Sequence, residues 1–278
     1  MLEHGVPFQL NSLVRRLVAP NPGAMTGAGT NTYLLGSKEI AVIDPGPAIP
    51  QHIEAILQAA EGGQIRWIVC THTHPDHSPA WQGVAEATGA QVIGAKPADD
   101  RFQDETFQPD WEIRHNEVLS TSEFNLRALH TPGHVSNHFC FLLEEEGMLF
   151  AGDHIMNGST VVIVPPGGDM KAYIESLELL LEYSIAHIAP GHGELIDDSV
   201  SEVKGLVAHR LRREAKVLAG LEQLGRCDLD ALVKVVYDDV DESLYEWAKL
   251  SMTAHLIKLE QEQRVVSDSA ALTWATLR

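Results

Sequence analysis

The chain lacks long hydrophobic stretches. No segment approaches the roughly 18 uninterrupted apolar residues that a membrane-spanning helix needs. The first ten residues have neither the basic start nor the apolar centre of a secretory signal. These two absences predict a soluble cytoplasmic protein with no membrane partner.

Cysteine is also scarce. Cys70, Cys140 and Cys227 are too few and too widely spaced for a disulfide framework or a thiolate metal site. Cys70 and Cys140 lie in apolar, strand-like runs, so we expect them to be small core residues. Reduced thiols agree with a cytoplasmic location.

Basic residues are outnumbered by acidic ones. Lys and Arg number 20 against 39 Asp and Glu, and the formal net charge is −19. Residues 1–200 carry 9 basic and 26 acidic groups, a net of 9 − 26 = −17, so a polyanion would meet a repulsive surface. Charge therefore disfavours RNA as a partner. Arg210, Arg212 and Arg213 form a local exception, which we expect on the solvated face of a helix.

Histidine is plentiful and clustered. His72-Thr73-His74-Pro75-Asp76-His77 follows an apolar segment and precedes an expected helix start, where Ser78 can cap and Pro79 fits the first turn. His72 and His74 are two apart in extended backbone and project to the same side. Asp76 and His77 lie past the bend and can serve a second ion. We interpret this stretch as a metal-binding loop rather than a solvated polar one.

Other ligand candidates stand just beyond apolar runs. Residues 124–129 precede His134, residues 148–150 precede Asp153, and residues 185–189 precede His192. Each run is typical of a buried strand, and the glycine or proline after it turns the chain. We therefore expect four strand ends to converge on one place.

The combined ligand set contains only nitrogen and oxygen donors, which suits two zinc ions and is also compatible with iron or manganese. We assign His72, His74 and His134 to one ion, Asp76, His77 and His192 to the other, and Asp153 to a position between them. Two such ions would hold a bridging water as hydroxide near neutral pH, and Asp76 is placed to orient it. The chemistry implied is hydrolysis.

The apolar pattern predicts mixed strands with helices outside them, an α+β fold in which two packed sheets lie between helices over residues 1–200. Strands are expected near 13–18, 31–35, 39–43, 67–70, 91–94, 125–130, 138–143, 148–151 and 186–189, with helices near 49–60, 79–88, 170–183 and 200–224 and a loop at 96–112.

Residues 201–278 differ in character from the rest. After the 200–224 helix come helices at 228–238 and 242–262 and short strands at 264–267 and 271–276, an order typical of a winged helix. This segment holds 11 basic and 13 acidic groups, a net of 11 − 13 = −2, without a dense basic stripe. We therefore expect no DNA binding.

These motifs resemble the metallo-beta-lactamase superfamily, whose signature is an HxHxDH loop followed by separate His, Asp and His ligands. All seven positions are matched. Asp44, in Asp44-Pro45-Gly46, matches an aspartate that supports the metal loop in that family, although a turn-forming role explains it equally well.

The chain is more closely similar to the beta-lactamase-like protein 2 family. The likeness rests on the stretch from Gly133 to Leu143 and on Gly168-Asp169-Met170, and it spans about residues 10–270. It implies an αββα sandwich followed by a small C-terminal helical, winged-helix-like domain.

Several remaining polar residues have more than one interpretation. We expect core packing or hydrogen bonding to a metal ligand, rather than metal contact, for His130, His138, His154 and His187. His138 is the best candidate for hydrogen bonding to a ligand. Pocket-lining and ordinary packing roles both stay open for Ser159, Thr160 and Tyr173.

Three functions remain. Asp153 counts against a true beta-lactamase, and Met156 stands where lactone-opening relatives have tyrosine. The acidic surface favours a hydrolase of small ester or thioester molecules. The alternatives are a metal-dependent endoribonuclease acting on single-stranded RNA, the activity associated with the animal relatives, and a noncatalytic binding protein. The sequence leaves the oligomeric state open.

Overall fold

The computed structural model describes residues 2–100 and 102–277 and contains two compact units. The first comprises the chain up to Thr131, Asn137–Val161 and Tyr183–Val200. The second comprises Pro132–Ser136, Val162–Glu182 and the chain from Ser201 onward. The second unit therefore includes two segments that interrupt the first unit along the sequence.

The first unit contains two mixed sheets. The larger has seven strands in chain order: β1 (Phe8–Gln9), β2 (Val14–Val18), β3 (Asn31–Leu35), β4 (Glu39–Ile43), β5 (Gln64–Val69), β6 (Gln91–Gly94) and β7 (Trp111–Glu112). The smaller has five strands in the order β12 (His187–Pro190), β11 (Met148–Gly152), β10 (Phe139–Leu143), β9 (Asn125–His130) and β8 (Val118–Ser120). Neighbours from β4 to β7 are parallel, as are β11 and β12.

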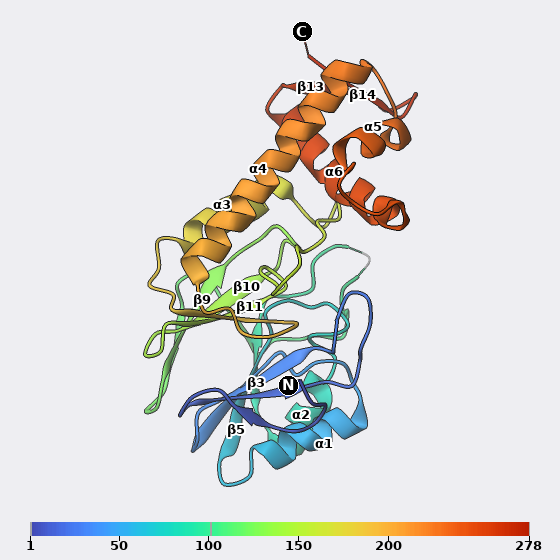
Figure 1. The fold of residues 1–278 in the computed structure, drawn as a ribbon. Coiled ribbons are helices and arrows are strands. Elements are labelled where there is room, and N and C mark those ends of the chain that lie inside the picture. Colours follow the sequence, from blue (N-terminus) through green and yellow to red (C-terminus); the bar gives the residue numbers. More distant parts are fainter. Residues whose placement is uncertain (1, 101, 278) are drawn as a thin grey trace. The chain divides into compact units, whose positions relative to one another are not determined.

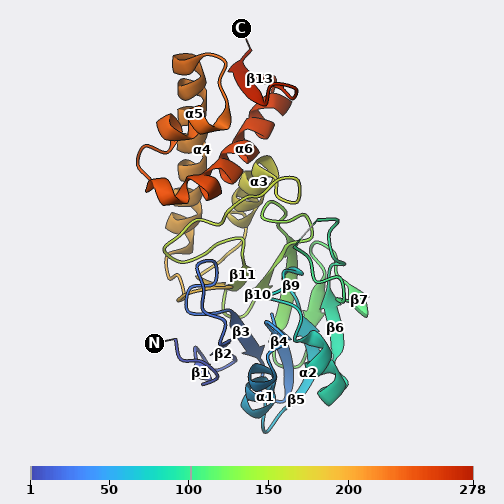
Figure 2. The ribbon, with the colours of Figure 1, turned by 90° about the vertical axis from the view of Figure 1, so that its right-hand side faces the viewer.

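The period-two alternation of the strands divides the core of this unit into two layers. In β4, Ala41 and Ile43 belong to a cluster that joins both sheets, whereas Ile40 and Val42 face a second cluster. The second cluster packs the larger sheet against α1 (Pro50–Ala59) and α2 (Trp81–Thr88), which Figures 1 and 2 show on one face of that sheet. A strand that is buried on both faces, such as β4, appears in the sequence as a continuous apolar run.

Each strand expected in residues 1–200 is present with similar bounds, and Cys70 and Cys140 are buried free thiols as expected. The short strands β1, β7 and β8 were not predicted, because two or three residues carry too little periodicity. The helix start at residues 78–79 was predicted wrongly. The α2 helix begins at Trp81 with Ala80 at its N-cap and without a side-chain cap. The Ser78 hydroxyl lies too early to cap it and donates to the Asp104 carboxylate at 2.9 Å.

The second unit is mainly helical. Its elements are α3 (Met170–Leu180), most of α4 (Ser199–Leu224), α5 (Leu229–Val236), the short η1 (Glu242–Leu244), α6 (Tyr245–Gln261) and the hairpin β13 (Val265–Asp268) and β14 (Thr273–Thr276). The apolar faces of α4, α5 and α6 share a core that includes Leu221, Leu232 and Met252. Among the described residues, no helix combines the length and apolar character needed to cross a membrane.

Two arginines of α4 are not on a solvated face, so that expectation was wrong for them. Arg210 and Arg213 are only 3% and 7% exposed. Their guanidinium groups lie 5.0 Å from the Tyr173 ring and 4.2 Å from the Tyr237 ring. Arginine tolerates such burial because its planar group stacks on aromatic rings while its stem packs as hydrocarbon. Arg212 is exposed, as expected.

Arg213→Ala is expected to lower the free energy of unfolding by about 2–3 kcal/mol. The buried guanidinium donates to the Val236 carbonyl at 2.6 Å and to Asp239 at 2.8 Å, and removing it leaves that carbonyl without this donor. Arg212→Ala is the matched control on the same helix, with an expected change within about 0.5 kcal/mol. Urea unfolding followed by circular dichroism measures both, and equal losses would contradict the burial-based account.

Candidate metal centre

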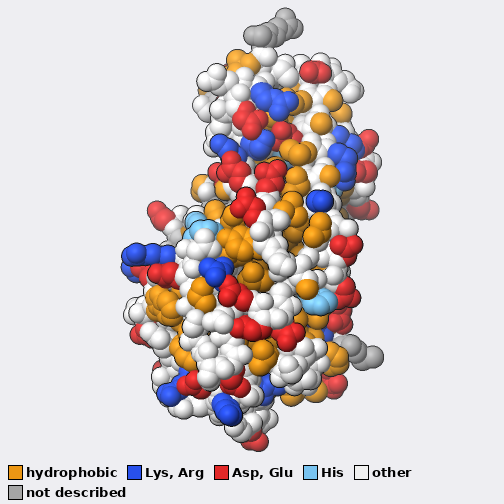
Figure 3. Space-filling view, turned by 90° about the vertical axis from the view of Figure 1, so that its left-hand side faces the viewer, with side chains coloured by type: hydrophobic (Ala, Val, Ile, Leu, Met, Phe, Trp, Pro, Cys, Tyr) orange, Lys and Arg blue, Asp and Glu red, His pale blue; other side chains and the backbone are white. Residues whose placement is uncertain are grey.

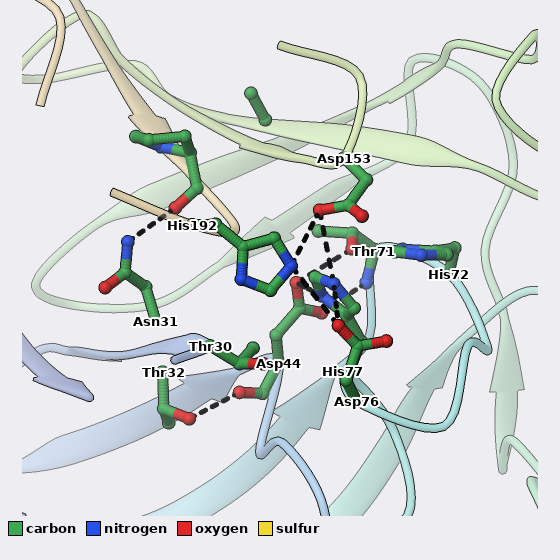
Figure 4. Close-up of polar contacts among 12 residues, drawn as sticks. Thr30, Asn31, Thr32, Asp44, Thr71, His72, Asp76, His77, Asp153 and His192 are labelled. Carbon is green, nitrogen blue, oxygen red and sulfur yellow. Dashed lines mark hydrogen bonds and ion pairs between the residues drawn. The ribbon is translucent and has the colours of Figure 1, made fainter. Parts of the chain in front are cut away.

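The candidate site lies at the ends of four strands of the first unit. Asp44 follows β4, residues 71–78 follow β5, Asp153 follows β11 and His192 follows β12. The pairs β4/β5 and β11/β12 are parallel, so the carboxyl ends within each pair lie at one sheet edge, where ligands of such sheets bind. Figure 4 shows the side chains from these loops pointing toward one another.

The polar atoms converge closely. His72, His77 and Asp153 form one group, and Asp76, His77 and His192 form another, with the ligand atoms of each group within 4.8 Å of one another. The Nε2 atom of His77 is 3.5 Å from Asp76 Oδ2 and 3.2 Å from Asp153 Oδ1. The Nε2 atom of His192 is 3.2 Å and 3.3 Å from the same two oxygens. The His74 ring lies 4.6 Å from that of His72.

Asp44 joins the metal loop to the end of β4. Its Oδ1 accepts from the Thr71 backbone N–H at 2.7 Å, and its Oδ2 accepts from the Thr71 hydroxyl at 2.8 Å and from His77 Nδ1 at 2.9 Å. The carboxylate is buried, and Asp44 has a positive φ of 48°. Asp44 thus both turns the chain and supports the loop, so the two interpretations of this residue hold together.

The hydrogen bonds give the imidazoles one tautomer. The Thr71 hydroxyl donates to Asp44, so its oxygen accepts from His72 Nδ1 at 3.0 Å. His77 Nδ1 donates to Asp44, and His192 Nδ1 donates to the Gly29 carbonyl at 3.2 Å. With Nδ1 protonated, the lone pair of each ring is on Nε2. An outer hydrogen bond of this kind is how proteins orient metal-binding histidines.

Charge is concentrated and buried here. Burial acts to lower the pKa of His77, but the carboxylates of Asp76, Asp153 and Asp44 outweigh it and raise the pKa well above its usual value. Burial likewise acts to lower the pKa of His192, and Asp153 and Asp76 raise it overall. For Asp76, burial acts to raise the pKa, whereas His77 and His192 lower it overall. The carboxylates therefore favour positive charge at this point.

These residues fit a divalent cation. The Nε2 atoms of His77 and His192 are buried and make no hydrogen bond among the described residues, although each faces two carboxylate oxygens. A lone pair directed at a carboxylate is repulsive unless a proton or a metal ion lies between them. Nitrogen and oxygen donors at this spacing are suited to zinc, iron or manganese, which must displace any protons held there.

His134 belongs to the second unit, in residues 132–136. Its Nδ1 donates to the Val162 carbonyl at 3.2 Å, which is the same tautomer as in the first unit. The preceding Gly133 has φ 144°, and a β-carbon there would lie 2.3 Å from Tyr173 Cα. Only glycine allows this close approach of the His134 segment to α3.

The remaining polar residues considered in the sequence are outside the proposed ligand set and are buried, paired or exposed as follows. His138 is fully buried, bonds through Nδ1 to the Thr131 hydroxyl at 3.0 Å, and has its ring 5.1 Å from that of His72. His154 is buried, and His187 faces Asp197 at 3.2 Å. Ser159 and Thr160 are exposed, whereas Tyr173 is buried beneath Arg210.

Sequence reasoning did not single out Thr71 or Asn31. Asn31 Nδ2 donates to the carbonyls of Pro190 at 3.0 Å and Gly193 at 2.8 Å, and so holds the loop that carries His192. Residues 30–32 are polar and lead into β3, whose remaining residues are apolar. A polar run entering a buried strand is the signal that could have identified it.

Comparison with known sequences shows that the chain belongs to the metallo-beta-lactamase superfamily. The pattern of that superfamily matches residues 25–192, and the pattern of the beta-lactamase-associated winged helix domain matches residues 229–274. The superfamily consists of metal-dependent hydrolases that bind divalent metals, and the resemblance inferred from the motifs is confirmed, as is the C-terminal winged helix.

Similar proteins cover nearly the whole chain. A beta-lactamase-like protein 2 homolog of Drosophila melanogaster is 35% identical over 94% of this chain and 93% of its own length. An atrochrysone carboxyl ACP thioesterase of Aspergillus chevalieri is 33% identical over 91% and 82%. A beta-lactamase domain protein from Burkholderia ambifaria superposes with a TM-score of 0.84, at 17% identity, over 100% of this chain and 95% of that one, which shows a shared fold.

Asp44→Asn is expected to weaken metal binding about 10- to 100-fold. The amide would turn an N–H₂ group toward Thr71 or His77, which are themselves donors to Asp44. Competition against a chromophoric chelator measures the affinity. Asp197→Asn is the matched control, because that carboxylate is exposed and pairs with His187, which is not a ligand candidate. Similar affinities for the Asp44 variant and the unaltered protein would refute the supporting role.

Proposed function

We propose that this protein is a dinuclear metal hydrolase acting on small ester or thioester molecules. The observation that supports it most directly is the pair of buried Nε2 atoms, in His77 and His192, that face the oxygens of Asp76 and Asp153. In this proposal three histidines hold one ion: His72, His74 and His134. An aspartate and two histidines hold the other: Asp76, His77 and His192. Asp153 lies between the two ions. Two Zn²⁺ ions fit best, and iron or manganese fit the same donors.

The chain itself supports including His134. His134 is three positions along the chain from both Thr131 and Asn137, and three positions span at most about 10 Å. The Thr131 N–H donates to the His138 carbonyl at 3.0 Å, and Asn137 Nδ2 donates to the Thr73 hydroxyl at 2.7 Å. Since Thr73 stands between His72 and His74, Asn137, which directly follows the His134 segment, is anchored to the metal loop.

Two bound ions would lower the pKa of water held between them toward neutrality and polarise the bond under attack. Asp76 then has a second role beyond its ligand role, because its carboxylate is placed to orient the attacking water. The two buried thiols of the first unit are poor nucleophiles, because burial raises the pKa of Cys140 to about 12 and that of Cys70 well above its usual value. The chemistry proposed is therefore direct attack by water.

The relatives and the surface charge favour small acyl substrates. Several fungal relatives are named as acyl-carrier-protein thioesterases, including one 33% identical to this chain. On the face drawn in Figure 3, Lys and Arg side chains are scattered among more numerous acidic ones. A net charge of −19 opposes the approach of RNA. We assign the chemistry to residues 1–200, with 201–278 as a winged-helix-like domain, in a cytoplasmic protein.

Metal analysis tests the ligand assignment. Protein saturated with zinc is expected to hold about two ions per chain, and Asp153→Ala to hold fewer, because the carboxylate between the two sets is lost. Elemental analysis after buffer exchange measures the content. Asp197→Ala offers a control, since this exposed aspartate pairs with His187 and is not a ligand candidate. One ion or none in the unaltered protein would refute the dinuclear site.

A substrate screen tests the proposed activity. Zinc-loaded protein is expected to hydrolyse S-acyl-N-acetylcysteamine thioesters faster than a single-stranded RNA oligonucleotide, and single turnover in oxygen-18 water is expected to place the label in the acid product.

Two histidine variants test the roles of the residues in this activity. His138→Ala is expected to retain about one-tenth to one-hundredth of the activity, as for a residue that supports a metal ligand without binding the metal, whereas His134→Ala is expected to abolish it. RNA cleavage with steep salt dependence would instead support the endoribonuclease alternative. A covalent acyl-protein seen by mass spectrometry would refute direct attack.

A further inference from the structure

The second unit contains a pocket of its own that the ligand residues do not occupy. Its volume is about 240 Å³. One wall comes from the segment before α3 and the start of that helix, and the other comes from α6. The apolar lining consists of Pro165, Pro166, Met170, Ala254 and Ile257.

The polar lining of this pocket is sparse and carries no positive charge. Asp169 and Gln261 are the polar side chains around it, and none of the described residues that line it is Lys, Arg or His. Asp169 also accepts from the Ala172 N–H at 2.9 Å as the cap of α3, so the helix start is already satisfied. A phosphate or carboxylate would meet only a carboxylate here. The lining is suited to a neutral, apolar group.

The pocket wall adjoins the segment that carries His134. The Asp169 N–H donates to the Gly133 carbonyl at 2.8 Å. A β-carbon on Gly168 would lie 3.1 Å from the His134 carbonyl oxygen. Tyr173, one turn after Met170 in α3, packs on Gly133. The His134 segment and the pocket wall are thus one packed block within the second unit.

We propose that this pocket binds the acyl chain of the substrate, in a neutral aliphatic thioester or ester. The inference rests on the proposed function, in which His134 binds a metal ion, because the packing of the pocket wall on the His134 segment then links the pocket to the reaction. An apolar cavity of about 150 Å³ holds a benzene molecule. The larger volume here accommodates an aliphatic chain of roughly six to eight carbons by the same standard.

Acyl chain length is the first test. Across S-acyl-N-acetylcysteamine thioesters from two to ten carbons, kcat/KM is expected to rise by up to about fourfold per methylene until the pocket is filled. Ala254→Phe, which fills the pocket, is expected to reduce the ratio of eight-carbon to two-carbon kcat/KM at least tenfold. Ile257→Ala, which enlarges it, is expected to move the optimum to longer chains. Ala219→Phe, at an exposed alanine of α4, is the matched control and leaves the ratio unchanged.

Direct binding separates this proposal from the proposed function. Protein labelled with carbon-13 at its methionine and isoleucine methyl groups is titrated with S-hexyl-N-acetylcysteamine, a thioether that cannot be hydrolysed. Shifts of the Met170 and Ile257 methyl signals that Ala254→Phe abolishes would support the pocket, even if no thioester were turned over and the proposed function failed. Thioester hydrolysis without chain-length preference, or titration without shifts at these two methyls, would overturn the pocket and leave the proposed function standing.

Discussion

The buried carboxylate of Asp44 is the interaction on which the candidate metal centre depends. It accepts three hydrogen bonds, from the Thr71 N–H, the Thr71 hydroxyl and His77 Nδ1. Through the Thr71 hydroxyl it also fixes the tautomer of His72. One anion at the end of β4 therefore directs the Nε2 lone pairs of two histidines from the neighbouring strand. Burying such a group without partners would be costly, so its hydrogen bonds and the loop conformation stabilise each other.

Much of the first unit was predictable because its strands are buried on both faces. A strand such as β4 places Ala41 and Ile43 in one core layer and Ile40 and Val42 in the other, so the whole run is apolar and its end is marked by Asp44-Pro45-Gly46. The candidate ligands could be found for the same reason. Polar residues placed just after buried strands are confined by topology to one edge of the sheets, as for His72, Asp153 and His192.

What the sequence did not predict depends on contacts between residues far apart in the chain. Ser78 is of a residue type favoured at helix N-caps, yet its hydroxyl donates to Asp104, 26 residues away. Arg210 and Arg213 look like solvated charges, but each stacks on a tyrosine from another element. Asn31 holds the loop of His192 across 159 positions of sequence. Periodicity reports which face of an element is apolar, and it carries no information about which distant partner satisfies a polar group.

Residues 132–136 and 162–182 belong to the second unit, so a fragment that contains only the first 200 residues would include part of each unit. α3 and the segment before it lie in the first two-thirds of the sequence, but their partners come from the last third. Arg210 stacks on Tyr173, α6 packs on α3, and the Ser251 hydroxyl accepts from the Ile163 N–H at 3.4 Å. A fragment ending at residue 200 would keep every metal-ligand candidate in its sequence and still lose the packing that holds α3 against Gly133. The helices of the last third of the sequence therefore help to hold the segment that carries His134, and replacing them would require that support to be rebuilt.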